Sequence, residues 1–254
     1  MSLKKNLPPL IELNEVDSTN NYAMGWARGK HLPKGHEEPV NGLAVLAYHQ
    51  TAGRGQRGKS WQSSHGESLS VSILLKPDFA DPGQPFPLLM AIAVAAAGVL
   101  QRYTGDETGI KWPNDLYWRN RKLGGILMET TVKGNSFNWV VAGIGINVLQ
   151  KQFPDFLQNP VSIKQITGKE ADIKQLALEL QEAVVTALEQ AAQNPLTYFE
   201  SYNQLLFGRN KTMKLKQGNR AFETLIKGVD AQGRLMTGAD GSTTFQFGEV
   251  EWML

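Results

Sequence analysis

The octapeptide Gly53-Arg54-Gly55-Gln56-Arg57-Gly58-Lys59-Ser60 decides how the fold of this 254-residue chain is interpreted. It satisfies the P-loop pattern G-x-x-x-x-G-K-[ST], in which Lys59 would contact nucleotide phosphates and Ser60 a magnesium ion. A P-loop needs a strand before it and a helix after it, because the helix N-terminus then faces the phosphates. An apolar run at 43–47 supplies the strand. Residues 61–66 have no helical apolar period, and 69–74 alternate as a second strand does, so the required helix is missing.

A basic, glycine-rich loop between two strands can still hold an anion. Glycines let backbone N–H groups approach a ligand closely, and arginine offers paired donors to a phosphate or carboxylate. Three alternating glycines with Arg54, Arg57 and Lys59 favour an anion site over a solvated basic hairpin. We therefore expect phosphate to bind here, by an architecture other than a P-loop.

The composition excludes several broad classes of protein. Lys and Arg number 26 against 24 Asp and Glu, so no strong field attracts nucleic acid or a membrane surface. There is no cysteine, hence no disulfide framework and no thiolate chemistry. The N-terminus lacks a signal-peptide core, and the longest apolar stretch, 86–100, is shorter than the ~20 residues of a membrane span. We expect a soluble cytoplasmic protein with no membrane partner.

The apolar pattern divides the chain at Gly208. Residues 1–207 alternate helices and strands, and residues 208–254 contain short β-type runs between glycine turns, typical of a small all-β domain. That domain is near the lower size limit for independent folding, so we expect it to pack on the first. Four helices are predicted: one after Asn20, one over 85–103, one after Asp172 and one over 195–207. Strands are predicted over 110–112, 116–118, 122–129 and 137–148.

Two segments in the second quarter of the chain offer candidate site residues. In Lys111-Trp112-Pro113-Asn114-Asp115, the Pro-Asn-Asp sequence alone is an ordinary turn. Lys122 is different, because it precedes Gly124 and Gly125 at the start of an apolar strand, where folding needs no long cation. Strand glycines often mark the close approach of a ligand. A lysine there would neutralise charge on a reacting phosphate or carboxylate.

A third segment, Gly143-Ile144-Gly145-Ile146-Asn147, gives a strand with one face free of side chains. A flat ligand against that face and a tight sheet crossing are equally compatible with it, and Asn147 is a candidate donor to a ligand. Ser18-Thr19-Asn20 precedes a helix, and helix capping alone explains it. The four histidines have no metal-ligand spacing, so we expect no metal site built by the protein. The G-x-S-x-G motif of serine nucleophiles is also absent.

In this order the segments resemble the biotin–protein ligases over nearly the whole chain. The pairing of Gly53-Arg54-Gly55 with Lys111-Trp112-Pro113-Asn114-Asp115-Leu116 is the most specific part of the resemblance. It implies an α+β fold with a mixed sheet flanked by helices, as in class II synthetases, and a small C-terminal β-barrel. It also implies a ligase that uses ATP and Mg²⁺ to make biotinyl-AMP and then modifies one lysine of a biotin carboxyl carrier domain, usually that of acetyl-CoA carboxylase.

The resemblance assigns roles residue by residue. Lys122, with Arg54 and Asp115, would be the catalytic group at the biotin carboxylate and α-phosphate. The roles of Lys111, Asn114 and Asp115 in holding the triphosphate, the metal or the incoming lysine stay open. The residues expected to contact biotin are Ser18, Thr19, Asn20, Gln50, Arg54, Gly55, Gln56, Lys122 and Gly125. Those expected to contact ATP are Arg54, Arg57, Trp61, Lys111, Asn114, Lys122 and Asn147.

The chain also departs from the resemblance. Gln56 and Lys59 stand where arginine is common, which puts the ordering of the loop over the adenylate in doubt. Only 17 residues precede Ser18, too few for the winged-helix domain of members that act as repressors, so no nucleic-acid partner is expected. Members of the family often form homodimers through a sheet edge, so the resemblance also allows a homodimer.

Three other functions are alternatives to a biotin–protein ligase: a lipoate–protein ligase, a P-loop nucleotide enzyme and a catalytically silent binding module.

Overall fold

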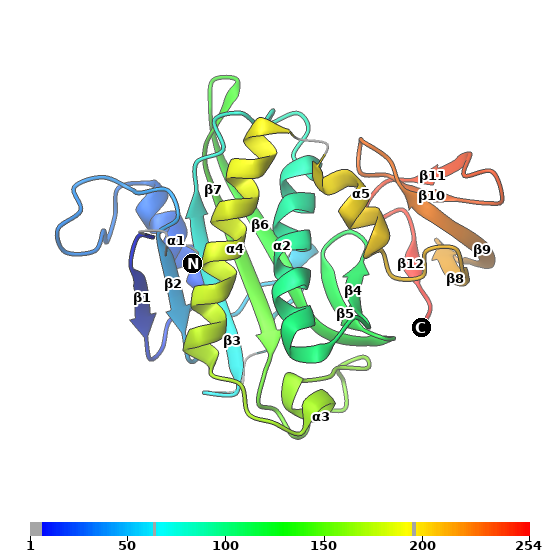
Figure 1. The fold of residues 1–254 in the computed structure, drawn as a ribbon, viewed down its shortest axis with the longest axis horizontal. Coiled ribbons are helices and arrows are strands. Elements are labelled where there is room, and N and C mark those ends of the chain that lie inside the picture. The colour runs from blue at the N-terminus through cyan, green and yellow to red at the C-terminus, as the bar shows by residue number, and fades with distance from the viewer. Residues whose placement is uncertain (1–6, 63–64, 195–196) are drawn as a thin grey trace.

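The computed structural model describes residues 7–62, 65–194 and 197–254, which form a large mixed sheet, a smaller antiparallel sheet and the helices that cover them (Figure 1). In the large sheet β1 and β2 are parallel and all other neighbours are antiparallel, which confirms the expected mixed sheet. Its strands, in spatial order, are β1 (Leu10–Leu13), β2 (Ala44–Ala47), β3 (Ser68–Leu75), β7 (Ser136–Asn147), β6 (Arg121–Lys133), β5 (Asp115–Trp118) and β4 (Thr108–Lys111).

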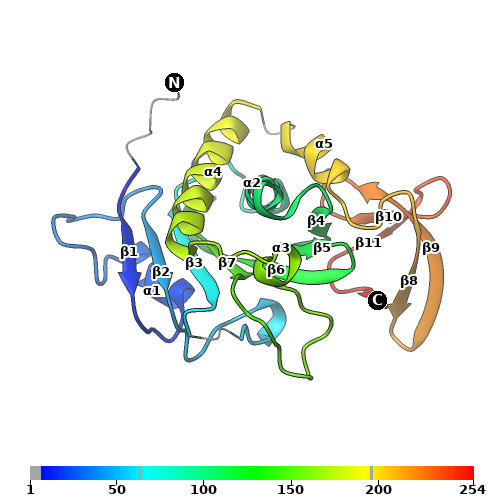
Figure 2. The same cartoon turned by 60° about the horizontal axis from the view of Figure 1, so that its bottom comes forward.

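Helices cover both faces of this sheet. Figure 2 shows α2 (Phe86–Thr104) and α4 (Ile173–Gln193) on one face, while α1 (Thr19–Ala27) packs on β2, β3 and β7 from the other. The period-2 alternation of β2 separates two cores, because Ala44 and Leu46 face α2 and α4 whereas Val45 packs beneath α1. The α1 face is left partly open, and the candidate site lies there.

The two long helices follow from the sequence. The Asp172 side chain accepts a hydrogen bond from the Gln175 backbone N–H and caps α4, whose predicted apolar face is buried. Helix α2 extends beyond the apolar stretch that ends at Leu100. At 19 residues it is long and apolar enough to span a membrane, but more than half of that span is buried, as in the core helix of a soluble protein.

The second sheet is the antiparallel C-terminal one. The sequence resemblance predicted a small barrel here; the strand pairing shows a five-stranded sheet with β11 and β12 as its edges. Its strands are β8 (Thr212–Gln217), β9 (Arg220–Val229), β10 (Leu235–Thr237), β11 (Thr243–Phe245) and β12 (Glu251–Trp252). The Trp112 indole donates to the Gly233 carbonyl at 2.9 Å, so this sheet packs against the first, as expected. The domain boundary at 207/208 stays a prediction.

The remaining elements include two that the sequence did not predict, β1 and α3 (Ile163–Thr167). Helix α5 (Thr197–Gln204) lies within the predicted range 195–207, whose first two residues are outside the described part of the chain. The glycine loop contains one 3₁₀ turn, Gln56–Gly58, and the next element is β3. Residues 63–64 are not described, and the residues around them contain no α-helix, so the P-loop architecture is wrong.

Candidate functional site

A cavity of about 550 Å³ opens on the α1 face of the sheet and brings together segments far apart in the sequence. Every residue that the sequence analysis assigned to the site lines it, except Asn147. The lining residues predicted from sequence are Ser18, Thr19, Asn20, Gln50, Arg54, Gly55, Gln56, Arg57, Trp61, Lys111, Asn114, Asp115, Lys122 and Gly125.

The floor of the cavity is one row of residues that crosses five strands. Ser70 on β3 pairs with Gly145 on β7, Gly145 with Gly125 on β6, Gly125 with Asp115 on β5, and Asp115 with Lys111 on β4. All five line the cavity. The residues at the centre of the row, Gly145 and Gly125, have no side chains, so they leave space above the sheet for a ligand. At one end of the row the carboxylate of Asp115 and the ammonium of Lys111 flank that space.

The glycines of β7 make room for protein side chains. A Cβ on Gly145 would lie 2.5 Å from the ring of Trp61, and a Cβ on Gly143 would lie 2.0 Å from Oδ1 of Asn20. The Trp61 indole and the Asn20 amide therefore lie against these glycines, which also line the cavity, and the expectation that a flat ligand rests against this strand stays a prediction.

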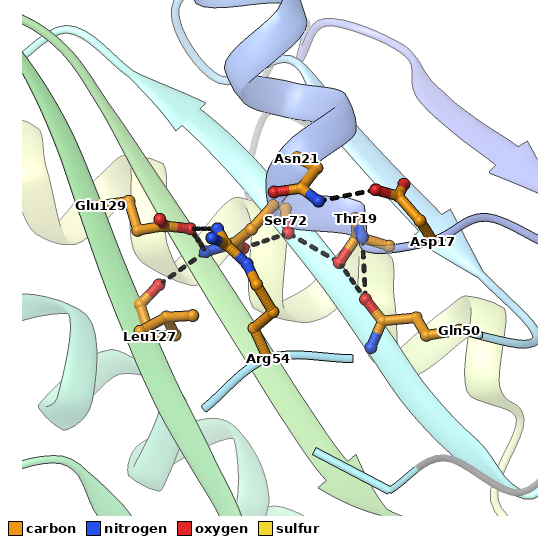
Figure 3. Close-up of polar contacts among 9 residues, drawn as sticks. Asp17, Thr19, Asn21, Gln50, Arg54, Ser72, Leu127 and Glu129 are labelled. Carbon is orange, nitrogen blue, oxygen red and sulfur yellow. Dashed lines mark hydrogen bonds and ion pairs between the residues drawn. The ribbon is translucent and has the colours of Figure 1, made fainter. Parts of the chain in front are cut away.

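A buried polar network lies at the start of α1 (Figure 3). The Thr19 backbone N–H and hydroxyl donate to Oε1 of Gln50 at 2.8 and 3.1 Å, and the Gln50 amide donates to Ser70 at 3.2 Å. The Ser72 hydroxyl is 2.8 Å from Oγ1 of Thr19 and 2.6 Å from Oδ1 of Asn20. These groups form a fixed polar wall, since buried polar atoms held by several partners have little freedom to reorient.

Helix capping does not account for the Ser18-Thr19-Asn20 segment. Ser18 occupies the N-cap position of α1 with an extended backbone, but its side chain makes no capping hydrogen bond. It is 1% exposed and lines the cavity. The side chains of this segment are thus directed to the site and its network rather than to the helix end.

Lys122 lies at the charged end of the floor. Its ammonium contacts Oδ1 of Asp115 at 2.6 Å, and both side chains are partly exposed to the cavity. A Cβ on Gly125 would lie 3.1 Å from Asp115 Oδ1 and 3.8 Å from Lys122 Nζ, so that glycine leaves space beside the pair. A reacting anion can therefore approach Lys122 across the floor.

Lys111 is the second cation at this end. Its ammonium donates to the Tyr117 hydroxyl at 3.1 Å and lies 4.8 Å from the centre of that ring. Burial lowers the pKa of Lys111 to about 8; Asp115 opposes this shift, and the positive charges of Lys122 and Lys59 add to it. An anionic ligand beside Lys111 would favour its charged form.

Two asparagines hold the floor strands in place. The Asn114 side-chain amide donates to the backbone carbonyl of Ile126, and the backbone N–H of Ile126 donates to the Asn114 carbonyl at 3.0 Å. These two hydrogen bonds fix β5 against β6 next to Lys122. Asn147 lies outside the cavity lining, and its amide donates to the backbone carbonyls of Lys122 and Val161 at 3.3 and 3.1 Å. Its expected contact with ATP stays a prediction, and its visible contact supports the strand that carries Lys122.

The glycine loop is fastened to other parts of the chain by two arginines. Arg54 forms an ion pair with Glu129 on β6. Arg57 lies 5.4 Å from the centre of the Phe247 ring and donates to the Gly248 carbonyl at 3.5 Å. The loop is consequently held over the cavity from both sides.

Several contributors to this site were not predicted from the sequence. Ser70, Phe247, Gly248 and Trp252 also line the cavity, and Glu129 supports it from behind. Glu129 had a detectable signal, because it is a carboxylate in phase with Gly125 and Leu127 on the cavity face of β6. No sequence signal marked the C-terminal residues Phe247, Gly248 and Trp252 as part of the site.

The sequence of the chain is similar to those of known protein ligases. The biotin/lipoate A/B protein ligase family matches residues 18–147. The chain is 33% identical over 228 residues to the bifunctional ligase/repressor BirA of Escherichia coli, which covers 89% of this chain and 68% of that protein. It is 31% identical over 165 residues to the biotin–[acetyl-CoA-carboxylase] ligase of Paracoccus denitrificans, which covers 63% of this chain and 65% of that protein.

Solved structures give the same relationship. The biotin protein ligase of Aquifex aeolicus in complex with biotin and ATP matches with a TM-score of 0.77 and 25% identity, over 96% of this chain and 99% of that one. The family match ends at Asn147 and so includes the start of α1, the glycine loop and the Lys122–Asp115 pair. The chain belongs to the biotin/lipoate A/B protein ligase family.

Proposed function

We propose that the protein is a biotin–protein ligase, which forms biotinyl-AMP from biotin and ATP and then transfers the biotinyl group to one lysine of a carboxyl carrier domain. The observation that carries this proposal is the Lys122–Asp115 pair, which lies in one cavity with the glycine loop and the polar start of α1. The Aquifex aeolicus structure that holds biotin and ATP supports it, as do the relatives named as ligases.

In the first step, a carboxylate oxygen of biotin attacks the α-phosphorus of ATP, the bond to the bridging β-phosphate oxygen breaks, and pyrophosphate leaves. Two anions must approach each other, so fixed cations at the reacting atoms lower the barrier. We assign this task to Lys122 and Arg54, with Asp115 orienting Lys122 through their 2.6 Å contact. Lys111 and Arg57 would hold the departing phosphates.

Biotin offers a compact polar ring on an apolar body. We assign the ring to the wall formed by Ser18, Thr19 and Asn20, where hydrogen-bonding groups are grouped in a small space. Gln50 and Gln56 would line the same end, and Trp61 would close the side against Gly145. The carboxylate would then lie toward Lys122.

In the second step, the amine of the carrier lysine attacks the acyl carbon of biotinyl-AMP, the bond from that carbon to the phosphate oxygen breaks, and AMP leaves. The amine passes its proton to solvent as the amide forms, and fixed cations favour the phosphate leaving group. Mg²⁺ usually binds through one or two carboxylates together with substrate phosphates, and neutralises phosphate charge when bound. Asp115 and Glu251 are the acidic residues among those lining the cavity, and Asp115 is the one beside Lys122.

Several finer features belong to the same proposal. The carrier would be the domain of acetyl-CoA carboxylase, the enzyme would act in the cytoplasm without a nucleic-acid or membrane partner, and it would pair as a homodimer. Residues 1–207 would form the catalytic domain and 208–254 a C-terminal domain that completes the cavity wall with Phe247 and Trp252.

The transfer reaction tests the function directly. The protein is incubated with biotin, ATP, Mg²⁺ and a carrier domain that has one acceptor lysine, and the carrier is weighed by intact-mass spectrometry. We expect one biotinyl group per carrier, and none on a carrier whose acceptor lysine is replaced by arginine. Transfer of lipoate but not of biotin would overturn the proposal and favour the lipoate alternative.

A further inference from the structure

Glu129 links two parts of the site that are otherwise separate. Its Oε2 accepts a hydrogen bond from the Asn20 amide at 2.8 Å and also pairs with the guanidinium of Arg54 (Figure 3). Gly125 and Leu127, which precede it in the same phase of β6, line the cavity, whereas Glu129 does not. Glu129 thus touches the residues that line the site without lining it itself.

The Glu129 carboxylate determines which way the Asn20 amide points. The amide nitrogen donates to Glu129 and, at 3.2 Å, to the Leu127 carbonyl, while its Oδ1 is 2.6 Å from the Ser72 hydroxyl. A flipped amide would place its oxygen against a carboxylate and a carbonyl, which are acceptors only. Because Gly143 leaves room for this amide and no more, Asn20 has one stable orientation.

The same carboxylate tethers the glycine loop. Arg54 is 41% exposed and Glu129 26% exposed, so the pair lies at the boundary of the cavity and is partly shielded from water. The other tether, Arg57 on Phe247 and Gly248, lies three residues further along the chain. Loss of the Glu129 contact would free the loop at its N-terminal end only.

We propose that Glu129 is a positioning residue, which holds the Asn20 amide and the Arg54 end of the glycine loop in one arrangement through a single carboxylate oxygen. The naming of biotin as the ligand positioned in this way rests on the proposed function. The opposite role, in which Glu129 competes with the ligand for Arg54, predicts tighter binding when the charge is removed, and so the two roles are distinguishable.

The tether is tested without any ligand, by limited trypsin digestion of the whole protein. Trypsin cleaves after Arg54, Arg57 and Lys59, and cleavage of a locally opened segment follows the population of its open form. We expect loop cleavage of Glu129→Gln to be about tenfold faster than that of the wild type, as a charge-assisted contact is lost. Glu170→Gln, which removes an exposed carboxylate paired with Lys164 away from the cavity, should match the wild type. Equal cleavage of Glu129→Gln and the wild type would overturn the proposal.

Steady-state kinetics test the positioning of Asn20. We expect Glu129→Gln to raise KM for biotin about tenfold with a smaller change in kcat, and Glu129→Asp, which keeps the charge, to recover part of that loss. A lower KM in Glu129→Gln would overturn the proposal in favour of competition.

A double-mutant cycle tests the pair itself. If the contact acts as a unit, loop cleavage at Arg57 and Lys59 should be no faster in Arg54→Gln/Glu129→Gln than in Arg54→Gln alone. Additive effects of the two substitutions would contradict the proposal. If Glu129→Gln does not fold, loop cleavage at Arg57 and Lys59 in Arg54→Gln, compared with the wild type, tests the tether instead. A wild type without biotin-dependent activity would refute the proposed function, while the digestion would still decide the tether.

Discussion

Arg57 and Gly248 lie against each other although one belongs to the glycine loop and the other to the C-terminal sheet region. The guanidinium donates to the Gly248 carbonyl at 3.5 Å, and a Cβ on Gly248 would lie 2.2 Å from its Nη1. Gly248 also has a φ of +88°. A glycine at this position therefore allows the C-terminal segment to close on the loop.

Gly248→Ala should displace Arg57 from Phe247 and weaken the loop closure. The left-handed backbone alone costs about 1–3 kcal/mol of stability for a residue with a side chain. Gly218→Ala is the matched control, because Gly218 has a φ of +56° and no atom lies within 4 Å of the position that its Cβ would take. We expect similar losses in the free energy of unfolding, but a severalfold fall in kcat/KM for ATP only in Gly248→Ala. Equal activity of the two variants would show that the contact has no role.

Gly143→Ala should disturb the biotin side of the site. Its Cβ would lie 2.0 Å from Oδ1 of Asn20, and overpacking of this kind costs about 1–3 kcal/mol. We expect a raised KM for biotin together with a lower free energy of unfolding. Gly98→Ala is the contrast, since Gly98 is exposed within α2 with no atom near its Cβ position; it should stabilise the protein by about 0.5–1 kcal/mol, as measured by urea denaturation, with unchanged kinetics.

Lys122→Ala should abolish adenylate formation while the fold stays intact. Removal of one charge-stabilising group from a reacting centre typically lowers the rate about 10²–10³-fold, a loss that takes adenylate formation below detection. Lys164→Ala removes a lysine that pairs with Glu170 instead, and should retain wild-type turnover. Single-turnover formation of biotinyl-AMP measures this step, and near-normal turnover of Lys122→Ala would refute the role of Lys122.

The pH dependence of ATP binding should report on Lys111. Its pKa is about 8 in the free protein because of burial, and a bound polyanion favours the protonated form. Lys111 is therefore charged without ligand below pH 8, and above pH 8 ATP binding must be coupled to proton uptake. KM for ATP should rise with pH above 8 by at most about tenfold per pH unit, and this rise should be absent in Lys111→Arg, whose guanidinium stays charged. A KM independent of pH in the wild type would contradict this.

Much of the fold is predictable because it rests on local periodicity. The helical spacing after Asp172 corresponds to α4, whose apolar face is buried as the pattern indicates. The alternation at 69–74 corresponds to β3, although there the polar Ser70 and Ser72 are buried as well as the apolar residues. The strand β1 and helix α3 were missed because four or five residues are too few for either period to appear. The helix predicted over 85–103 corresponds to α2, which ends one residue later at Thr104.

The candidate site was predictable as a set of motifs but not as a geometry. Local sequence identifies Lys122 beside glycines, but only the register across β4, β5, β6 and β7 shows that Asp115, Gly125 and Gly145 form one row. The contact of Arg57 with Phe247 joins the glycine loop to the turn between β11 and β12, and no local pattern specifies it. The sequence also left the purpose of Gly143 open, which the position of Asn20 now explains.

The most direct test of the account is the biotin-dependent exchange of labelled pyrophosphate into ATP. This exchange requires only the formation of biotinyl-AMP and the reversal of that step, so it does not depend on the carrier. We predict rapid exchange with biotin, none with lipoate, and none with Lys122→Ala under the same conditions. Exchange that proceeds with lipoate but not with biotin would contradict the account.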